Sequence, residues 1–259
     1  MIDYNYHTHT FRCGHATGKE RDYIEAAIAR GIKVLGFSDH ILFESKNEES
    51  KEKLYDYIKT INELKEEYKD KIEIHLGFEC EHFDDRVDYY NYLLKEKGIE
   101  YLILGQHYIT AKDGTRLDMF KELKDSHEIA KRYYLCVKEG LKSGLYKYLA
   151  HPDLYTREFK EIDKVYLKYA KKICKAAKKY NVPIEINLNG LYYKGVRNIQ
   201  TPTYPCEQFF EVAGKVGNDV MIGVDAHSAE LITNADYEWA EQIIEKYHLH
   251  HVTRLDFTK

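Results

Sequence analysis

Short apolar segments that end in a histidine or a carboxylate recur along this chain and constrain its fold more than any other feature. They begin at Ile2, Lys33, Ile72, Tyr101, Tyr146, Pro183 and Val220, with a further candidate at His251. Most are near-continuous apolar runs, which are typical of strands buried on both faces of a sheet. Stretches with helical spacing of apolar residues lie between them, at 19–31, 51–70, 86–97, 126–142, 162–180, 205–216 and 234–247. Strand followed by helix, about seven times, predicts parallel strands joined by helical crossovers.

Residue types that bind metals fall at the ends of nearly all these predicted strands. In chain order they are His7 with His9 and His15, Asp39 and His40, Glu79 and Glu81, His107, His151, and Asp225 with His227. In a β/α barrel the carboxyl ends of the strands share one face, and that face carries the active site. The sequence therefore predicts an α/β fold, a closed barrel of about seven units in one domain (1–259), with a metal site at the carboxyl ends of its strands.

The spacing of these residues predicts how ions would be shared. His7 and His9 lie on the same side of an extended segment, because side chains alternate with a period of two. Asp225 and His227 repeat that spacing. A carboxylate can bridge two ions, and Glu79 is the preferred bridge because it ends its apolar run, although Glu81 points to the same side. Imidazole and carboxylate ligands suit Zn, Mn or Fe, and about nine ligands would serve three divalent ions.

Other polar residues are interpreted as structural. Asp39 is a candidate for orienting a ligand, and Cys13 and Cys80 are expected to pack. Ser126 and Asn234 are predicted helix N-caps, and the 24 tyrosines are expected at the edges of strands and helices. The histidines interpreted as hydrogen-bonded structural residues are His75, His82, His127, His248 and His250.

Composition restricts the class of protein. The net charge of -4 argues against a nucleic-acid binder with a broad basic face. Five scattered cysteines without a C-x-x-C pair indicate reduced thiols. No apolar run approaches the ~20 residues of a membrane span, and no secretory signal is visible. We expect a cytoplasmic protein with a small-molecule partner, and the sequence leaves its oligomeric state open.

Six motifs together resemble the polymerase and histidinol phosphatase (PHP) superfamily. They are HTHT with the following His15, FSDH (37–40), GFE (77–79), GQH (105–107), AHPD (150–153) and GVDAH (223–227). The segment IEINLNGLYYKGVRN (184–198), followed by Tyr-Pro, is similar to the stand-alone histidinol-phosphatase branch. The resemblance implies a distorted seven-stranded, TIM-like barrel with a trinuclear site. The ligands that it implies are His7, His9, His15, His40, Glu79, His107, His151, Asp225 and His227.

Two segments depart from that branch. The loop lacks the expected serine-bearing N-T-S-G, and GQHY replaces G-S-V-H. Both departures leave the metal ligands in place and bear on the substrate. Residues 187–205, rich in turn residues, are predicted to form an irregular functional loop.

The resemblance and the ligand chemistry predict a phosphomonoesterase, with L-histidinol phosphate as the expected substrate in histidine biosynthesis. A metal-bridging hydroxide would attack phosphorus, with Glu79 and Asp225 holding the ions. Arg157 and Arg197 are candidate phosphate ligands, although surface ion pairing explains either equally well. Asp153, Asp39 or water on a metal could protonate the leaving group. Glu81, Asp153 or Asn187 could receive the substrate ammonium.

Three alternatives stay open. A PHP phosphoesterase could act on another small phosphate monoester or a nucleotide. An amidohydrolase also begins with His-x-His, but usually needs a carbamylated lysine, and the fourth predicted strand ends in His107 instead. A non-catalytic polymerase accessory or metal-storage module is the third, and the full ligand set argues against it.

Overall fold

Parallel strands form two sheets that face each other around one interior in the computed structural model, which describes residues 2–41, 48–121, 123 and 125–257. The first sheet has the order β1 (Tyr4–Asn5), β2 (Val34–Phe37), β3 (Glu73–Cys80), β4 (Tyr101–Leu104). The second has the order β7 (Ile184–Asn187), β8 (Asp219–Gly223), β9 (His250–His251). Every neighbouring pair in these two sheets is parallel, as the alternation of strand and helix predicts.

Two narrow junctions close the sheets into a barrel. Leu149 pairs with Leu104 on one side and Ile184 on the other, so residues 147–150 join β4 to β7. On the opposite side, Thr8 pairs with Ala226. The predicted seven-unit barrel is thus confirmed in a distorted form: the expected fifth strand is reduced to isolated bridges, and the first strand is only two residues long.

Side chains replace backbone pairing between β1 and β8. The Asn5 amide oxygen accepts from Val224 N at 2.9 Å, and the Tyr4 hydroxyl accepts from Ile222 N at 2.9 Å. Because side chains stand between the two backbones here, a regular ladder cannot form. The backbone ladder of β1 is therefore the one with β2, which covers only Tyr4 and Asn5.

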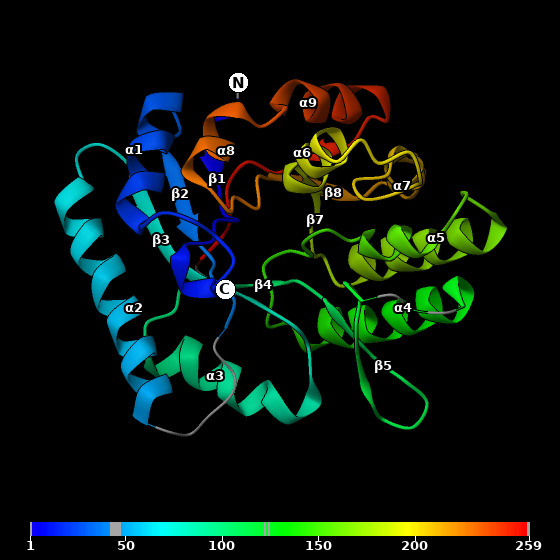
Figure 1. Cartoon of the computed structure of the whole chain (residues 1–259), viewed down its shortest axis with the longest axis horizontal. Coiled ribbons are helices and arrows are strands. Elements are labelled where there is room, and N and C mark those ends of the chain that lie inside the picture. Colours follow the sequence, from blue (N-terminus) through cyan, green and yellow to red (C-terminus); the bar gives the residue numbers. More distant parts are fainter. Residues whose placement is uncertain (1, 42–47, 122, 124, 258–259) are drawn as a thin grey trace.

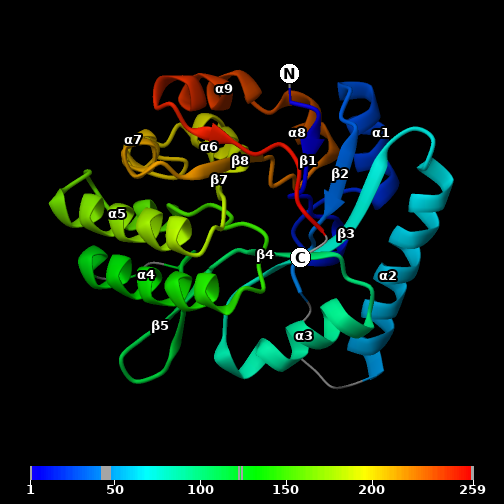
Figure 2. The ribbon, with the colours of Figure 1, turned by 180° about the vertical axis from the view of Figure 1, so that it is seen from behind.

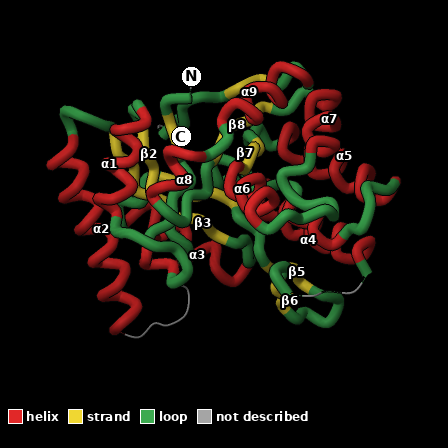
Figure 3. The backbone as a smooth tube through the Cα atoms, turned by 45° about the horizontal axis from the view of Figure 1, so that its top comes forward, coloured by secondary structure: helices red, strands yellow, loops and turns green. Residues whose placement is uncertain are grey.

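Helices cover the outside of the barrel (Figures 1 and 2), with α1 against α8 and α5 between α4 and α7. An antiparallel hairpin of β5 (Tyr108–Thr110) and β6 (Arg116–Asp118), which the sequence did not predict, projects beside α4 (Figure 3). Within the described ranges, no helix is long and apolar enough to cross a membrane. The helices are α1 (Glu20–Arg30), α2 (Glu48–Tyr68), α3 (Val87–Glu96), α4 (Ser126–Ser143), α5 (Lys164–Lys179), α6 (Leu188–Val196), α7 (Glu207–Val216), α8 (Ala229–Asn234) and α9 (Tyr237–Lys246).

Three local predictions were wrong. Asp125, not Ser126, caps α4 by accepting from Glu128 N. Asp236 caps α9, whereas Asn234 ends the unpredicted helix α8. The stretch 187–205 is not wholly irregular, because Asn187 caps α6 by accepting from Gly190 N at 3.0 Å. In each case an Asp or Asn side chain satisfies an N–H group of the first helical turn.

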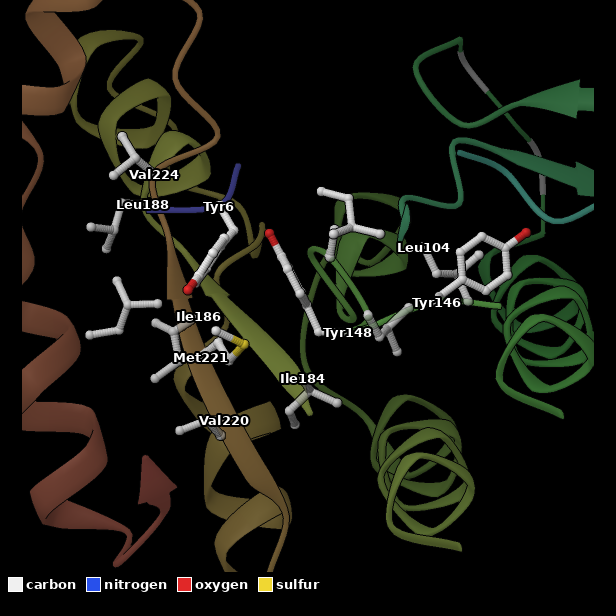
Figure 4. Packing of buried hydrophobic residues seen from close by; sticks show 14 of the residues in the cluster. Tyr6, Leu104, Tyr146, Tyr148, Ile184, Ile186, Leu188, Val220, Met221 and Val224 are labelled. Atoms are coloured by element: carbon white, nitrogen blue, oxygen red, sulfur yellow. The ribbon is translucent and has the colours of Figure 1, made fainter. Parts of the chain in front are cut away.

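Tyrosines fill much of the barrel interior rather than only its edges. The Tyr101 ring occupies space that a Cβ at Gly36 or Gly77 would enter, coming within 2.2 and 2.4 Å of it. Its hydroxyl donates to the carbonyl oxygens of Tyr6 and Phe37 at 2.9 and 3.0 Å. Figure 4 shows Tyr6 and Tyr148 beside Ile186 and Met221 in the same core. The phenol rings fill the barrel interior, and hydroxyls such as that of Tyr101 donate hydrogen bonds to backbone carbonyl oxygens near the strand ends.

Candidate metal centre

Glu79, near the end of β3, lies at the centre of a group of histidines. Its side chain is 1% exposed. Oε1 lies 2.8 Å from His151 Nε2 and 3.5 Å from Nε2 of both His7 and His107. Oε2 lies 3.0 Å from His40 Nδ1 and 3.4 Å from His9 Nε2. One carboxylate therefore faces two sets of imidazoles, which is the arrangement of a bridging ligand.

Asp225, beyond β8, completes the inner part of the group. Its Oδ1 lies 3.2 Å from His9 Nε2 and 3.4 Å from His7 Nε2. Its Oδ2 accepts from the side-chain amides of Asn187 and Asn189 at 3.1 and 3.3 Å. The two asparagines lie at the junction of β7 and α6, so the IEINLNG segment orients this carboxylate.

Two of the predicted ligands have a left-handed backbone. The φ angle is +27° at His151 and +52° at Asp225, each just after a barrel segment. Such conformations cost on the order of 1 kcal/mol or more outside glycine and concentrate at functional sites. They turn both side chains back over the mouth of the barrel.

A second group of imidazoles lies on the more exposed side. His15 Nε2 and His227 Nε2 are 2.9 Å apart. The ring of His40 lies 5.2 Å from that of His15, centroid to centroid. His15, His40 and His227 each offer a nitrogen within 4.8 Å of the others. These three imidazoles could therefore hold a metal ion.

The unsatisfied atoms of the inner group fit divalent ions. His7 Nε2, both ring nitrogens of His9 and His151 Nδ1 are buried and make no hydrogen bond to any residue that the structure describes. Buried polar atoms are rarely left unpaired, so such a cluster is typical of an ion-binding site. Cys13, expected only to pack, also has its sulfur within 4.8 Å of ligand nitrogens of His9 and His227. A donor set of imidazoles and carboxylates suits Zn, Mn or Fe.

The charges of this site are strongly coupled. Burial alone would lower the pKa of His7, but Glu185, Asp225 and Glu79 raise it well above its ordinary value. Burial would raise the pKa of Glu79, yet the surrounding histidines lower it well below its ordinary value. Burial, with His227 and His40, lowers the pKa of His9. Protons thus balance the carboxylates where no ion is bound, and metal binding would release them.

Two further carboxylates orient neighbouring groups. Glu81 Oε1 lies 3.0 Å from His107 Nδ1. Asp39 accepts from the backbone N–H and the hydroxyl of Thr10 at 2.7 and 2.8 Å, so it holds the HTHT segment. Asp39 therefore supports the HTHT segment. Glu81 contacts the candidate ligand His107 and also lines the cavity.

A cavity of about 980 Å³ opens over the ligands, and both predicted arginines line it. The Arg157 guanidinium lies 4.4 Å from the centroid of the Phe120 ring, and its buried Nη1 makes no hydrogen bond within the described part of the chain. Arg197 lies over the Tyr193 ring at 4.7 Å. Arg116, from the unpredicted hairpin, also lines the cavity, although it pairs with Asp85 at 2.7 Å. Sequence reasoning missed Arg116 because its hairpin interrupts the barrel pattern.

Asp153 is buried but is not among the residues that line this cavity. Its Oδ2 accepts from Cys206 N at 2.5 Å, which ties the 3-10 helix η3 (Leu154–Glu158) to the segment before α7. Burial raises the pKa of Asp153 to about 7. The structure therefore does not bring Asp153 to the cavity wall with Glu79, Asp225 and the two arginines.

The family assignment follows from a match over most of the chain. The PHP domain model matches residues 5–189. The chain belongs to the PHP domain family. Asp225 and His227 lie beyond the matched residues, and it is the barrel that brings them to the same site.

Individual relatives agree with this assignment. The chain is 27% identical over 229 residues to the "Probable histidinol-phosphatase" of Deinococcus radiodurans, covering 85% of each protein. It is also similar to the crystal structure of histidinol phosphate phosphatase from Lactococcus lactis, complexed with Zn, L-histidinol and phosphate. That likeness has a TM-score of 0.74 at 19% identity, and covers 98% of this chain and 99% of the other. A structure from Listeria monocytogenes has a TM-score of 0.75 at 18% identity, and the likeness covers 91% of this chain and 99% of the other. Structural likeness at such identities shows the shared fold.

Proposed function

We propose that this PHP-family chain is a metal-dependent phosphomonoesterase that hydrolyses L-histidinol phosphate to L-histidinol and phosphate. The observation that carries the proposal is the convergence of nine candidate ligands below a cavity with arginines on its wall. The names of its relatives support the same substrate: a histidinol-phosphatase in Deinococcus radiodurans and a Lactococcus lactis structure that contains L-histidinol and phosphate.

Three divalent ions (Zn, Mn or Fe) are proposed for the site. Two would be held by the inner group, and one by the outer imidazoles of His15, His40 and His227. When bound, such ions neutralise phosphate charge and lower the pKa of coordinated water. The inner ligands would be His7, His9, Glu79, His107, His151 and Asp225.

The chain's own residues would bind and orient the substrate. Arg157 and Arg197 would hold phosphate oxygens, since a guanidinium offers paired donors that match this geometry. The Nη1 of Arg157, which has no hydrogen-bond partner among the described residues, supports that role. Glu81 lies on the cavity wall and would receive the substrate ammonium. We assign no proton transfer to Asp153, because its carboxylate binds Cys206 N away from the cavity lining.

Phosphate release by the purified protein tests the proposal. The protein would be loaded separately with Zn, Mn or Fe and given L-histidinol phosphate, a nucleoside monophosphate, a sugar phosphate and glycerol phosphate. We expect the highest kcat/KM with L-histidinol phosphate. A preference for another ester would overturn the substrate but keep the phosphomonoesterase. Release no faster than in a chelator-treated control, for every ester and metal, would overturn both.

A further inference from the structure

Glu185, a fully buried residue of β7, contacts ligands from two other parts of the barrel. Its Oε1 lies 2.7 Å from His7 Nδ1. Its Oε2 accepts from His151 N and from the side-chain amide of Asn187, both at 2.9 Å. The same Asn187 amide donates to Asp225 at 3.1 Å. One carboxylate below the site therefore connects to three candidate ligands.

The neighbouring strand is shaped around this carboxylate. A Cβ at Gly223 on β8 would lie 1.8 Å from Glu185 Oε1, so only glycine leaves room for it. Glu185 lies on the β7 strand, two positions before Asn187, and pairs with Met221 in register. These contacts and the space at Gly223 hold the side chain against His7.

We propose that Glu185 is a positioning residue that fixes the proton of His7 on Nδ1 and so presents Nε2 to the metal site. A carboxylate only accepts hydrogen bonds, so the His7 Nδ1 beside it donates. His7 Nε2 is buried, has no hydrogen bond among the residues described, and lies 3.5 Å from Glu79 Oε1 and 3.4 Å from Asp225 Oδ1. This inference rests on the metal site of the proposed function and is independent of the substrate.

The substitution Glu185→Gln separates charge and hydrogen bonding from shape. If the new amide group replaces Oε2, its N–H groups face two donors, His151 N and the Asn187 amide. If it replaces Oε1, it faces His7 Nδ1, which must then accept, and the proton moves to Nε2 where the ion would bind. Either outcome disturbs the site with almost no change in volume. Losing such an orienting partner typically lowers metal affinity by about 10–100-fold.

The chain offers a matched control at another carboxylate–imidazole pair. Glu100 Oε2 lies 2.5 Å from His75 Nδ1, and within the described part of the chain neither residue contacts a candidate ligand. Glu100→Gln therefore makes the same chemical change without touching the site.

Zinc affinity and histidine tautomers test the proposal together. Zinc would be titrated against a chromophoric chelator, and long-range 1H–15N spectra of histidine-labelled, zinc-loaded protein would report whether His7 carries its proton on Nδ1. We expect Glu185→Gln to lose about 10–100-fold in zinc affinity and to shift or lose the Nδ1 proton signal of His7, while Glu100→Gln matches the wild type. A folded Glu185→Gln with wild-type affinity and tautomer would overturn the proposal.

Two further outcomes keep the inference separate from the proposed function. If Glu185→Gln does not fold, Glu185→Asp carries the test, because its shorter side chain withdraws from His7 and should weaken zinc binding; unchanged affinity would overturn the proposal. A wild-type protein that binds zinc but does not hydrolyse L-histidinol phosphate would refute the substrate alone. A wild-type protein that binds no zinc would refute the metal site and this inference with it.

Discussion

Glu79 Oε1 lies 2.8 Å from His151 Nε2, although 72 positions separate the two residues in the chain. They come from segments on either side of β4, and the curvature of the barrel turns both toward its mouth. Gly105, just after β4, makes this contact possible, because a Cβ there would lie 1.9 Å from Glu79 Oε1. The arrangement of the proposed metal centre thus depends on a glycine that is not itself a candidate ligand.

Gly105→Ala is expected to displace the Glu79 carboxylate and lower metal affinity and kcat/KM by at least about 10-fold, the lower range for losing an orienting residue. The matched control is Gly195→Ala in α6, where a Cβ meets nothing within 4 Å and the helix should gain about 0.5–1 kcal/mol. Metal content and phosphate release of both variants check the prediction. Wild-type metal content in Gly105→Ala would contradict it.

Arg157→Ala is expected to raise KM by about 10–100-fold, since a hydrogen bond to a charged group contributes about 1.5–3 kcal/mol. Arg197→Ala should act in the same direction. Steady-state kinetics with L-histidinol phosphate measures both. Arg132→Ala, which removes a cation paired with Glu128 at 2.8 Å on α4, is the control and should leave KM unchanged. If kcat and KM of Arg157→Ala and Arg197→Ala stay at wild-type values, the phosphate-binding role is refuted.

Chelation is expected to lower the Tm. An ion at a thousandfold excess over its Kd stabilises the native state by about 4 kcal/mol, which corresponds to about 8–16 °C for a chain of this size class. Differential scanning calorimetry with and without chelator measures the change. The Glu79→Gln variant should respond much less, because its central ligand is lost. An identical Tm for the wild type in both conditions would count against a tightly bound ion.

Glu100, which lies outside the candidate metal centre, is expected to make the stability of the fold depend on pH. Burial would raise the pKa of Glu100, but hydrogen bonds from His75 and Lys65 lower it below 4.5. A carboxyl group whose pKa is lower in the folded state stabilises the protein above pH 4.5, and this contribution is lost as the pH falls through the folded pKa. Glu100→Gln should therefore destabilise the protein at pH 7 by on the order of 1–3 kcal/mol.

The difference between Glu100→Gln and the wild type should shrink toward pH 3. Urea unfolding of both proteins in chelator, at pH 7 and at acidic pH, measures it without interference from bound metal. If the two proteins have the same free energy of unfolding at pH 7, or if their difference grows in acid, Glu100 does not stabilise the fold as a carboxylate.

The barrel could be predicted because its pattern is local. Parallel strands give continuous apolar runs, and the carboxyl ends of such strands share one face of the barrel. Residues as distant in sequence as His7 and Asp225 could therefore be predicted to lie together. Exact strand lengths could not be predicted, since the side chains of Tyr4 and Asn5 replace backbone pairing only once β8 lies beside β1.

The supporting residues of the site depend on tertiary contacts. Glu185 looks like any polar residue of a strand, and only the fold shows its contacts with His7 and His151 N. Asp153 is the converse case. The sequence offers it as one of three candidates for protonating the leaving group, and the structure directs its Oδ2 to Cys206 N. Neighbours in sequence at a sharp turn need not face the same space.

Anomalous diffraction at the metal absorption edge, on crystals of the purified protein, would locate the proposed ions. We expect anomalous peaks on both sides of the Glu79 carboxylate, within ligand distance of His7, His151 and Asp225, and a further peak among His15, His40 and His227. Crystals of Glu79→Gln should lose or weaken the inner peaks. A wild-type map with no anomalous density among these side chains, from protein that still releases phosphate, would contradict the account.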